Sequence, residues 1–153
     1  MAVTGVEVFL NLWLRVRVAQ GEVLGDRETL FKELSKRVHL GHKLSQWPQR
    51  FLSAALDLKA GPGGAFVDLK CLRNSIVHFT SPHESIDLGN VAIHGLADTT
   101  AYDELSAEKA RWALQTAENF IAEIFCLSGL SSKQVSDALH AWTGRVPDQP
   151  RPG

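Results

Sequence analysis

The sequence predicts an all-α fold, an up-and-down helical bundle with short accessory helices. Apolar residues recur at steps of three and four along nearly the whole chain, which is the period of an amphipathic helix. Glycine, proline and serine interrupt this pattern at intervals typical of the turns between helices. The chain has 153 residues, of which 44% are hydrophobic, and this is enough for one packed core.

Glycines bound the first two helices that we expect. Apolar residues at helical spacing predict a helix over residues 5–20, which Gly21 ends. Asp26 is expected to cap the second helix, because a carboxylate at that position accepts hydrogen bonds from the first unpaired N–H groups. The second helix then continues through its apolar stripe until Gly41 closes it.

The middle of the chain predicts two more helices separated by a glycine-rich loop. The third covers residues 44–58, with Pro48 near its start, where a missing N–H is tolerated. The run at 61–64 combines glycine and proline and predicts a loop. The fourth helix covers residues 65–79 and ends before Pro82.

The C-terminal part begins with a loop over residues 83–100, in which a short apolar run at 91–93 could form a small strand. A long helix follows Thr99 or Thr100 and runs through Leu127.

A last short helix, capped by Ser131 or Ser132, extends through Trp142. We therefore expect a single helical domain over residues 1–144. The remaining residues, 145–153, are expected to form a Pro-rich, disordered tail.

Charge and cysteine content limit the function. The net charge is −1 and the pI about 6.6, so the chain lacks a global basic field and only a local basic patch could hold nucleic acid. The two cysteines, Cys71 and Cys126, are too few for a disulfide scaffold and are expected to be buried thiols. Arg15 and Arg17 interrupt the first apolar stretch too early for a membrane span, so we expect a soluble, cytoplasmic protein.

The most informative segment is the run from Leu72 to Phe79, which contains Arg73, Asn74 and His78 within an apolar helical stretch. Asn74 and His78 are one turn apart on one helix face, and Arg73 is adjacent. The negative C-terminal end of the helix favours the protonated form of an imidazole there, which suits a group that takes and gives a proton near neutral pH.

These residue types match the needs of RNA cleavage without a metal. A base must take the proton of the 2′-hydroxyl, an acid must protonate the 5′-oxygen, and a cation must stabilise the charge on phosphorus. Histidine can act as base or acid, and the guanidinium of arginine fits phosphate oxygens. Asparagine can orient the phosphate or the imidazole. One helix supplies one histidine, so a two-fold dimer that faces this helix against its copy would supply two.

The run resembles the R-N-x-x-x-H signature of the HEPN family of small all-helical domains, best over residues 65–127. The resemblance implies a HEPN-type bundle and a homodimeric, metal-independent endoribonuclease with a composite site at the dimer interface. Arg73, Asn74 and His78 would be its catalytic residues, acting on single-stranded or tRNA-like RNA and leaving a 2′,3′-cyclic phosphate. Such a protein would be a toxin paired with an antitoxin, or a phage-defence effector. Thr80 stands where one antitoxin-paired subfamily has tyrosine, which sets this chain apart from that group.

Neighbouring polar residues could extend the site. Lys70 lies one turn before Arg73 and could contact phosphate, although a solvated lysine is the alternative. His83 follows the motif helix and could also contact the substrate. His39 and His42 have a spacing that could hold a metal, but no third ligand is nearby, so we expect neither a metal nor a cofactor.

Two other functions remain open from the sequence. HEPN domains also occur as non-catalytic modules that bind nucleotides, RNA or a partner protein, and the low net charge is compatible with this. The chain could also be a purely structural bundle, in which Arg73 and His78 cap carbonyl groups and pair with an acidic neighbour.

Overall fold

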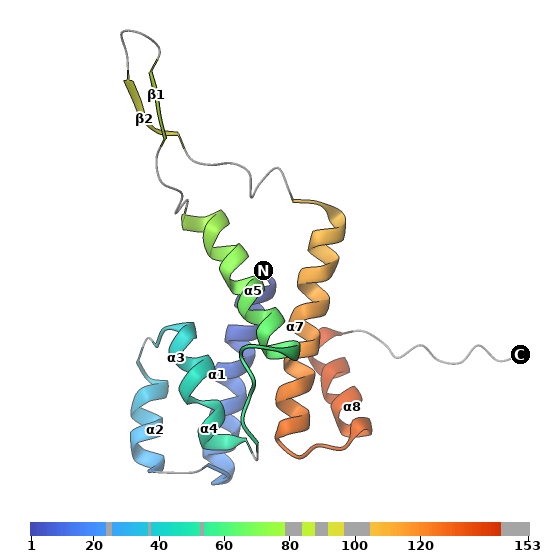
Figure 1. Ribbon diagram of the computed structural model, residues 1–153. Helices are drawn as coiled ribbons and strands as arrows, with labels where there is room; N and C mark the ends of the chain where they lie inside the picture. The colour runs from blue at the N-terminus through green and yellow to red at the C-terminus, as the bar shows by residue number, and fades with distance from the viewer. Residues whose placement is uncertain are drawn as a thin grey trace, which may run out of the picture.

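The computed structural model confirms the all-α class, since the packed body consists of helices whose directions alternate along the chain (Figure 1). The structure describes residues 1–23, 26–36, 38–52, 54–78, 84–87, 92–96 and 105–144. Its elements are α1 (Ala2–Gln20), α2 (Arg27–Leu34), α3 (Leu40–Gln46), α4 (Pro48–Phe51), α5 (Gly61–His78), β1 (Glu84–Asp87), β2 (Ala92–Leu96), α7 (Ala107–Leu127) and α8 (Ser132–Thr143). The predicted tail, 145–153, lies outside the described residues.

The hydrophobic core is built around α1, which packs against α7 on one side and α2 on the other. Phe9 is fully buried and meets the ring of Phe125 edge to face at 5.3 Å. Phe66 of α5 stacks on Phe120 of α7 at 4.4 Å between ring centroids. These aromatic pairs hold α1, α5 and α7 together, and α5 is thereby fixed beside the first half of α1.

The α1 and α2 predictions are largely confirmed. The helix α1 begins at Ala2 rather than at residue 5, and Gly21 ends it with a φ of 75°. The carboxylate of Asp26 accepts hydrogen bonds from the backbone of the next turn and caps α2. A hydrogen bond from the hydroxyl of Thr29 is the main cause that lowers the pKa of Asp26 below its ordinary value of 3.8. The second helix ends at Leu34 and does not reach Gly41, which instead lies within α3.

The prediction of one helix over residues 44–58 was wrong. Two short helices, α3 and α4, meet at Trp47, and Pro48 begins α4 because it lacks the N–H that would continue α3. The backbone becomes extended at Leu52, with φ −101° and ψ 146°, so the chain leaves the helical path there.

The prediction of a loop over residues 61–64 was also wrong, because these residues form the first turn of α5. A Cβ on Gly63 would lie 2.1 Å from the carbonyl oxygen of Asp57, and one on Gly64 would lie 2.9 Å from the carbonyl carbon of Lys59. The glycines therefore let α5 start in direct contact with the preceding extended segment.

The helix α7 begins at Ala107, later than the predicted start after Thr99 or Thr100, and ends at Leu127 as predicted, while α8 matches its predicted extent. Ser106 caps α7, whereas Thr99 and Thr100 lie outside the described residues. Ser131 and Gln134 form a reciprocal capping box at the start of α8, as the sequence predicted for one of the two serines.

The predicted loop at 83–100 contains two short strands in its described parts. The strands β1 and β2 pair antiparallel, with a register irregularity between Glu84 and Ile86. Figure 1 shows this hairpin beyond the outer ends of α5 and α7, away from the helical core. Among the described helices, none is both long and apolar enough to cross a membrane.

Candidate nucleic-acid interface

The helix α5 carries the predicted site on its outer half. Its first half is anchored, because Phe66 and Leu69 are buried against the core. Beyond them, Arg73 is exposed and donates a hydrogen bond from its guanidinium to Oδ1 of Asn74 at 3.0 Å. The pairing holds the two side chains next to each other and leaves the remaining N–H groups of the guanidinium available to a ligand.

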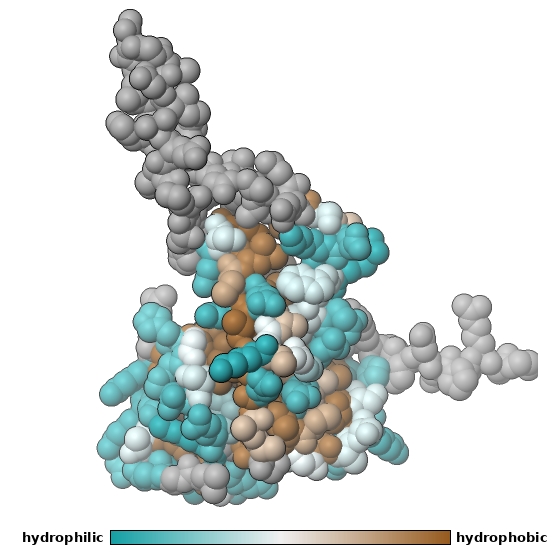
Figure 2. Space-filling view, viewed as in Figure 1, coloured by the Kyte–Doolittle hydropathy of each residue, from teal (hydrophilic) through white to brown (hydrophobic). Residues whose placement is uncertain are grey.

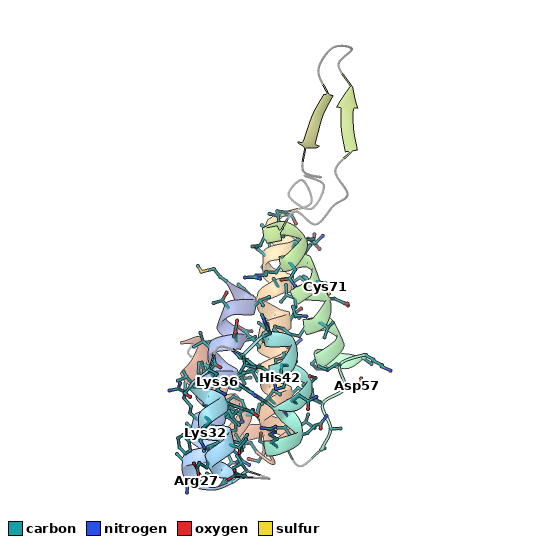
Figure 3. The ribbon with its side chains drawn as sticks, turned by 90° about the vertical axis from the view of Figure 1, so that its left-hand side faces the viewer. Arg27, Lys32, Lys36, His42, Asp57 and Cys71 are labelled. Carbon is teal, nitrogen blue, oxygen red and sulfur yellow. The ribbon has the colours of Figure 1, made fainter. Side chains whose placement is uncertain are left out.

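A groove with a volume of about 1010 Å³ runs between α1, α3, α5 and the segment that joins α2 to α3. Figure 3 looks onto the side of the molecule where α2, α3 and α5 lie side by side, with Lys36 and His42 labelled. Lys70, Arg73 and Asn74 of α5 all line this groove. The other lining residues are Val3, Thr4, Glu7, Val8, Asn11, Leu12, Arg15, Leu34, Lys36, Val38, His39, Leu40, Gly41 and Lys43.

The charged residues described in the groove are mainly cationic. Lys43 is neutralised, since its ammonium group lies 2.6 Å from a carboxylate oxygen of Glu7. Four cations remain beyond this pair, and they come from separate parts of the chain: Arg15, Lys36, Lys70 and Arg73. Their combined field favours an anionic ligand, although the net charge of the whole chain is −1.

None of these four cations has a carboxylate partner within the described parts of the chain. Arg15 donates to the carbonyl oxygen of Leu34 at 3.2 Å, which fixes its position and leaves its charge uncompensated. Cations held near one another without counter-charges attract a ligand that carries several negative charges, such as a polyphosphate or a nucleic-acid backbone.

Six aliphatic residues also line the groove. They come from α1, the end of α2, the segment before α3 and the start of α3: Val3, Val8, Leu12, Leu34, Val38 and Leu40. No phenylalanine, tyrosine or tryptophan is among the lining residues that the structure describes, and His39 supplies the one aromatic ring there. Contacts with a nucleic acid would therefore be made mainly to its phosphates.

A smaller, mostly aliphatic cavity of about 540 Å³ lies on the other side of Arg73, between the start of α1, α5 and α7. Leu72 and Ile76 of α5 line it, and apolar side chains are visible along α5 in the space-filling view (Figure 2). Arg73 lines both hollows. A long cationic side chain can lay its aliphatic stem against apolar surface while its charged end stays accessible to an anionic ligand.

The structure thus brings together three of the predicted site residues, Lys70, Arg73 and Asn74. His78 is the last described residue of α5, in the last turn where the sequence predicted it, but its side chain lies outside the described part. His83 also lies outside the described residues.

No pattern in the sequence indicated that the other two cations, Arg15 and Lys36, belong to the groove. They stand far from the motif in the chain and reach the groove only because α1 and the segment before α3 pack beside α5. The ion pair of Lys43 could have been predicted from the sequence. Lys43 stands among Leu40, Leu44 and Trp47, and a cation in such an apolar stretch suggests a buried partner of opposite charge.

The remaining side chains that could bind a metal or react are histidines and cysteines. His39 and His42 are both exposed, and His39 lines the groove. Among the described residues, no group of three or more histidine, cysteine or acidic side chains could hold a metal ion. The expectation of buried thiols was wrong, since Cys71 and Cys126 are both exposed free cysteines on outward faces of α5 and α7.

No family model, curated protein or solved structure matches this chain. The resemblance to HEPN domains therefore depends on the residues from Leu72 to Phe79 and their helical context.

Proposed function

We propose that this protein is a metal-independent endoribonuclease of the HEPN type. The observation that carries the proposal is the cationic groove in which Lys70, Arg73 and Asn74 meet Arg15 and Lys36. A groove with several uncompensated cations favours a polyanion, and RNA is the polyanion whose cleavage suits the Arg-Asn-His motif.

Each motif residue has a role in this mechanism. Arg73 stabilises the negative charge that develops on the phosphate, and Asn74 orients the phosphate or the imidazole. His78 transfers protons, taking the proton of the 2′-hydroxyl or giving one to the 5′-oxygen. Attack by the 2′-oxygen breaks the bond from phosphorus to the 5′-oxygen and leaves a 2′,3′-cyclic phosphate.

One histidine cannot be base and acid in the same step. Two copies of the chain with α5 facing α5 would supply a second His78, so the proposed enzyme is a homodimer at this site. Its biological role would be that of a toxin held by an antitoxin, or of an effector in phage defence.

The test is a cleavage assay on total cellular RNA in excess EDTA. The native protein should yield discrete fragments that end in a 2′,3′-cyclic phosphate. His78→Ala should lower the rate by about 100-fold or more, because general acid–base catalysis contributes that much. His140→Ala is the matched control, since this partly buried histidine lies on α8 and bonds the carbonyl of Ser136. Cleavage that needs Mg²⁺, or that is unchanged in His78→Ala, contradicts the mechanism.

A second candidate is a non-catalytic module that binds RNA or nucleotides. The groove supports it directly, because binding a phosphate backbone needs only the cations and no proton-transfer residue. An affinity for single-stranded RNA that falls in Arg73→Ala, with intact RNA recovered after incubation, would favour this function over the enzyme.

A further inference from the structure

Phe31 is an aromatic residue on the outer surface of α2, with 49% of its surface exposed. Among the side chains whose burial the structure describes, no other phenylalanine, tyrosine or tryptophan is as exposed. No aromatic ring or cationic group in the described part of the chain packs against its ring. A free, exposed ring can stack on a nucleic-acid base, because every base has a π-face.

Phe31 lies next to one end of the cationic groove. Leu34, which is one turn after Phe31 on the same helix, is among the residues that line the groove. Arg15 lines the groove as well, and its guanidinium donates a hydrogen bond to the carbonyl oxygen of Leu34 at 3.2 Å. A strand that lies in the groove and continues past Arg15 can therefore reach Phe31.

A second guanidinium lies on the other side of Phe31. Arg27, one turn before Phe31, donates to the carbonyl oxygen of Ala19 at 3.1 Å. This bond and the bond from Arg15 join α2 to α1 in an antiparallel arrangement, and the two helices lie side by side in Figure 1. Phe31 is therefore between the two guanidinium groups along α2, and Figure 3 shows Arg27 at the end of α2 away from Lys36.

The acidic residues described around α2 have partners of their own. Three of them form ion pairs: Glu22 with Arg17, Glu28 with Lys32 and Glu33 with Arg50. Asp26 accepts hydrogen bonds from the backbone of the first turn of α2. Neither Arg15 nor Arg27 pairs with a carboxylate of the residues that the structure describes. Positive charge on both sides of the Phe31 ring therefore favours an anionic strand at this surface.

We propose that Phe31 is a stacking platform for one unpaired base of single-stranded RNA, whose backbone continues from the groove past Arg15. The inference rests on the proposed function, because it needs RNA in the groove. It also adds a contact that the groove offers little of, since the cations there hold phosphates whereas Phe31 holds a base. The bases of a duplex are already stacked and paired, so the substrate must carry an unpaired segment at this surface.

The test measures the affinity of the protein for a fluorescein-labelled, 2′-O-methylated single-stranded oligonucleotide, which cannot be cleaved by attack of a 2′-hydroxyl. Phe31→Ala and Phe31→Leu should each weaken binding by about 5-fold or more, because both remove the ring. Phe31→Tyr keeps the ring and should bind as the native protein does. Trp112→Leu is the matched control, since Trp112 is an exposed aromatic residue on α7 that does not line the groove.

A strand of the same length that lacks all its bases separates stacking from a structural role of Phe31. The native protein and Phe31→Ala should bind this abasic strand equally, because it offers no base to stack. They should also bind a blunt RNA duplex equally, because its bases are not available to the ring.

The outcomes distinguish the platform from the proposed function. If Phe31→Ala binds the single strand as the native protein does, while replacing Lys70 and Arg73 together abolishes binding, the platform is overturned and the RNA site in the groove stands. An equal loss of affinity for the abasic strand in Phe31→Ala, or a loss in Phe31→Tyr as large as in Phe31→Ala, also overturns the platform. A native protein with no measurable affinity for any of these nucleic acids would overturn both proposals.

Discussion

Lys43 is the most buried charged side chain among the residues that the structure describes, with 5% of its surface exposed. Its ammonium group pairs with Glu7 at 2.6 Å and lies 5.5 Å from the ring centroid of Trp47. The pair connects α3 to α1 and forms part of the wall of the groove. A buried cation is tolerated there because the carboxylate and the ring replace the water that it has lost.

Removing the carboxylate should therefore destabilise the protein more than removing both charges. A fully buried pair that loses one partner costs about 3–5 kcal/mol, and the partial exposure of Glu7 lowers this, so Glu7→Gln should cost about 1–3 kcal/mol. Lys43→Met should cost less, and the Glu7→Gln variant should be partly rescued when Lys43→Met is added. Urea unfolding at one protein concentration measures all three values. Additive effects of the two substitutions would show that the ion pair contributes no coupling.

Arg73 and Asn74 show what the sequence can and cannot predict about single residues. Their adjacency and the hydrogen bond between them follow from a motif that is contiguous in the chain. The exposure of Cys71 could not be predicted in this way. The helical period places Cys71 near apolar residues, but which of these residues are buried depends on where α1 and α7 lie. A residue's type and spacing therefore indicate which face it occupies, but not which face the rest of the molecule covers.

At the scale of helices, the predictions succeeded where a strong period and a local cap coincide. The helices α1, α2 and α8 begin or end at residues whose caps are encoded nearby: Gly21, Asp26 and Ser131. They failed between residues 40 and 64, where the outcome depends on contacts between segments. Apolar spacing over 44–58 suggested one helix, but Pro48 starts a new one and the chain then extends so that it can reach the start of α5.

The glycines at the start of α5 provide a test of this tertiary contact. Gly63→Ala would place a Cβ 2.1 Å from the carbonyl oxygen of Asp57, so backbone must shift, and we expect a loss of about 1–3 kcal/mol. Gly41→Ala is the matched control, since Gly41 is helical and a Cβ there meets nothing within 4 Å. The control should be neutral or stabilising by up to about 1 kcal/mol, because alanine favours a helix over glycine. Thermal unfolding of both variants measures the difference, and equal stabilities would contradict the close contact.

At the scale of the whole molecule, packing creates the groove from parts that no local pattern connects. The motif helix contributes Lys70, Arg73 and Asn74, whereas Arg15 comes from α1 and Lys36 from the segment after α2. The sequence therefore predicted the part of the site that lies on one helix and missed the part that depends on which helices are neighbours.

The groove also predicts how RNA binding depends on salt. If Arg15, Lys36, Lys70 and Arg73 each neutralise one phosphate, the logarithm of the affinity for single-stranded RNA should fall with the logarithm of salt concentration at a slope of about −2.8. Replacing Lys70 and Arg73 together by alanine should reduce the magnitude of this slope by about 1.4. Fluorescence anisotropy with a 2′-O-methylated oligonucleotide measures it without cleavage, because attack on phosphorus needs a free 2′-hydroxyl.

The matched control for that measurement removes two cations that lie outside the groove. Lys32 is on the outer face of α2, where it pairs with Glu28 (Figure 3), and Lys133 is an exposed residue at the start of α8. Replacing both by alanine changes the net charge as much as the Lys70 and Arg73 substitutions do, yet should leave the slope unchanged. If both double variants reduce the slope equally, binding follows the overall charge of the protein and the groove is not its site. If only the Lys70 and Arg73 variant does, the phosphates lie along α5, next to the residues proposed to cleave them.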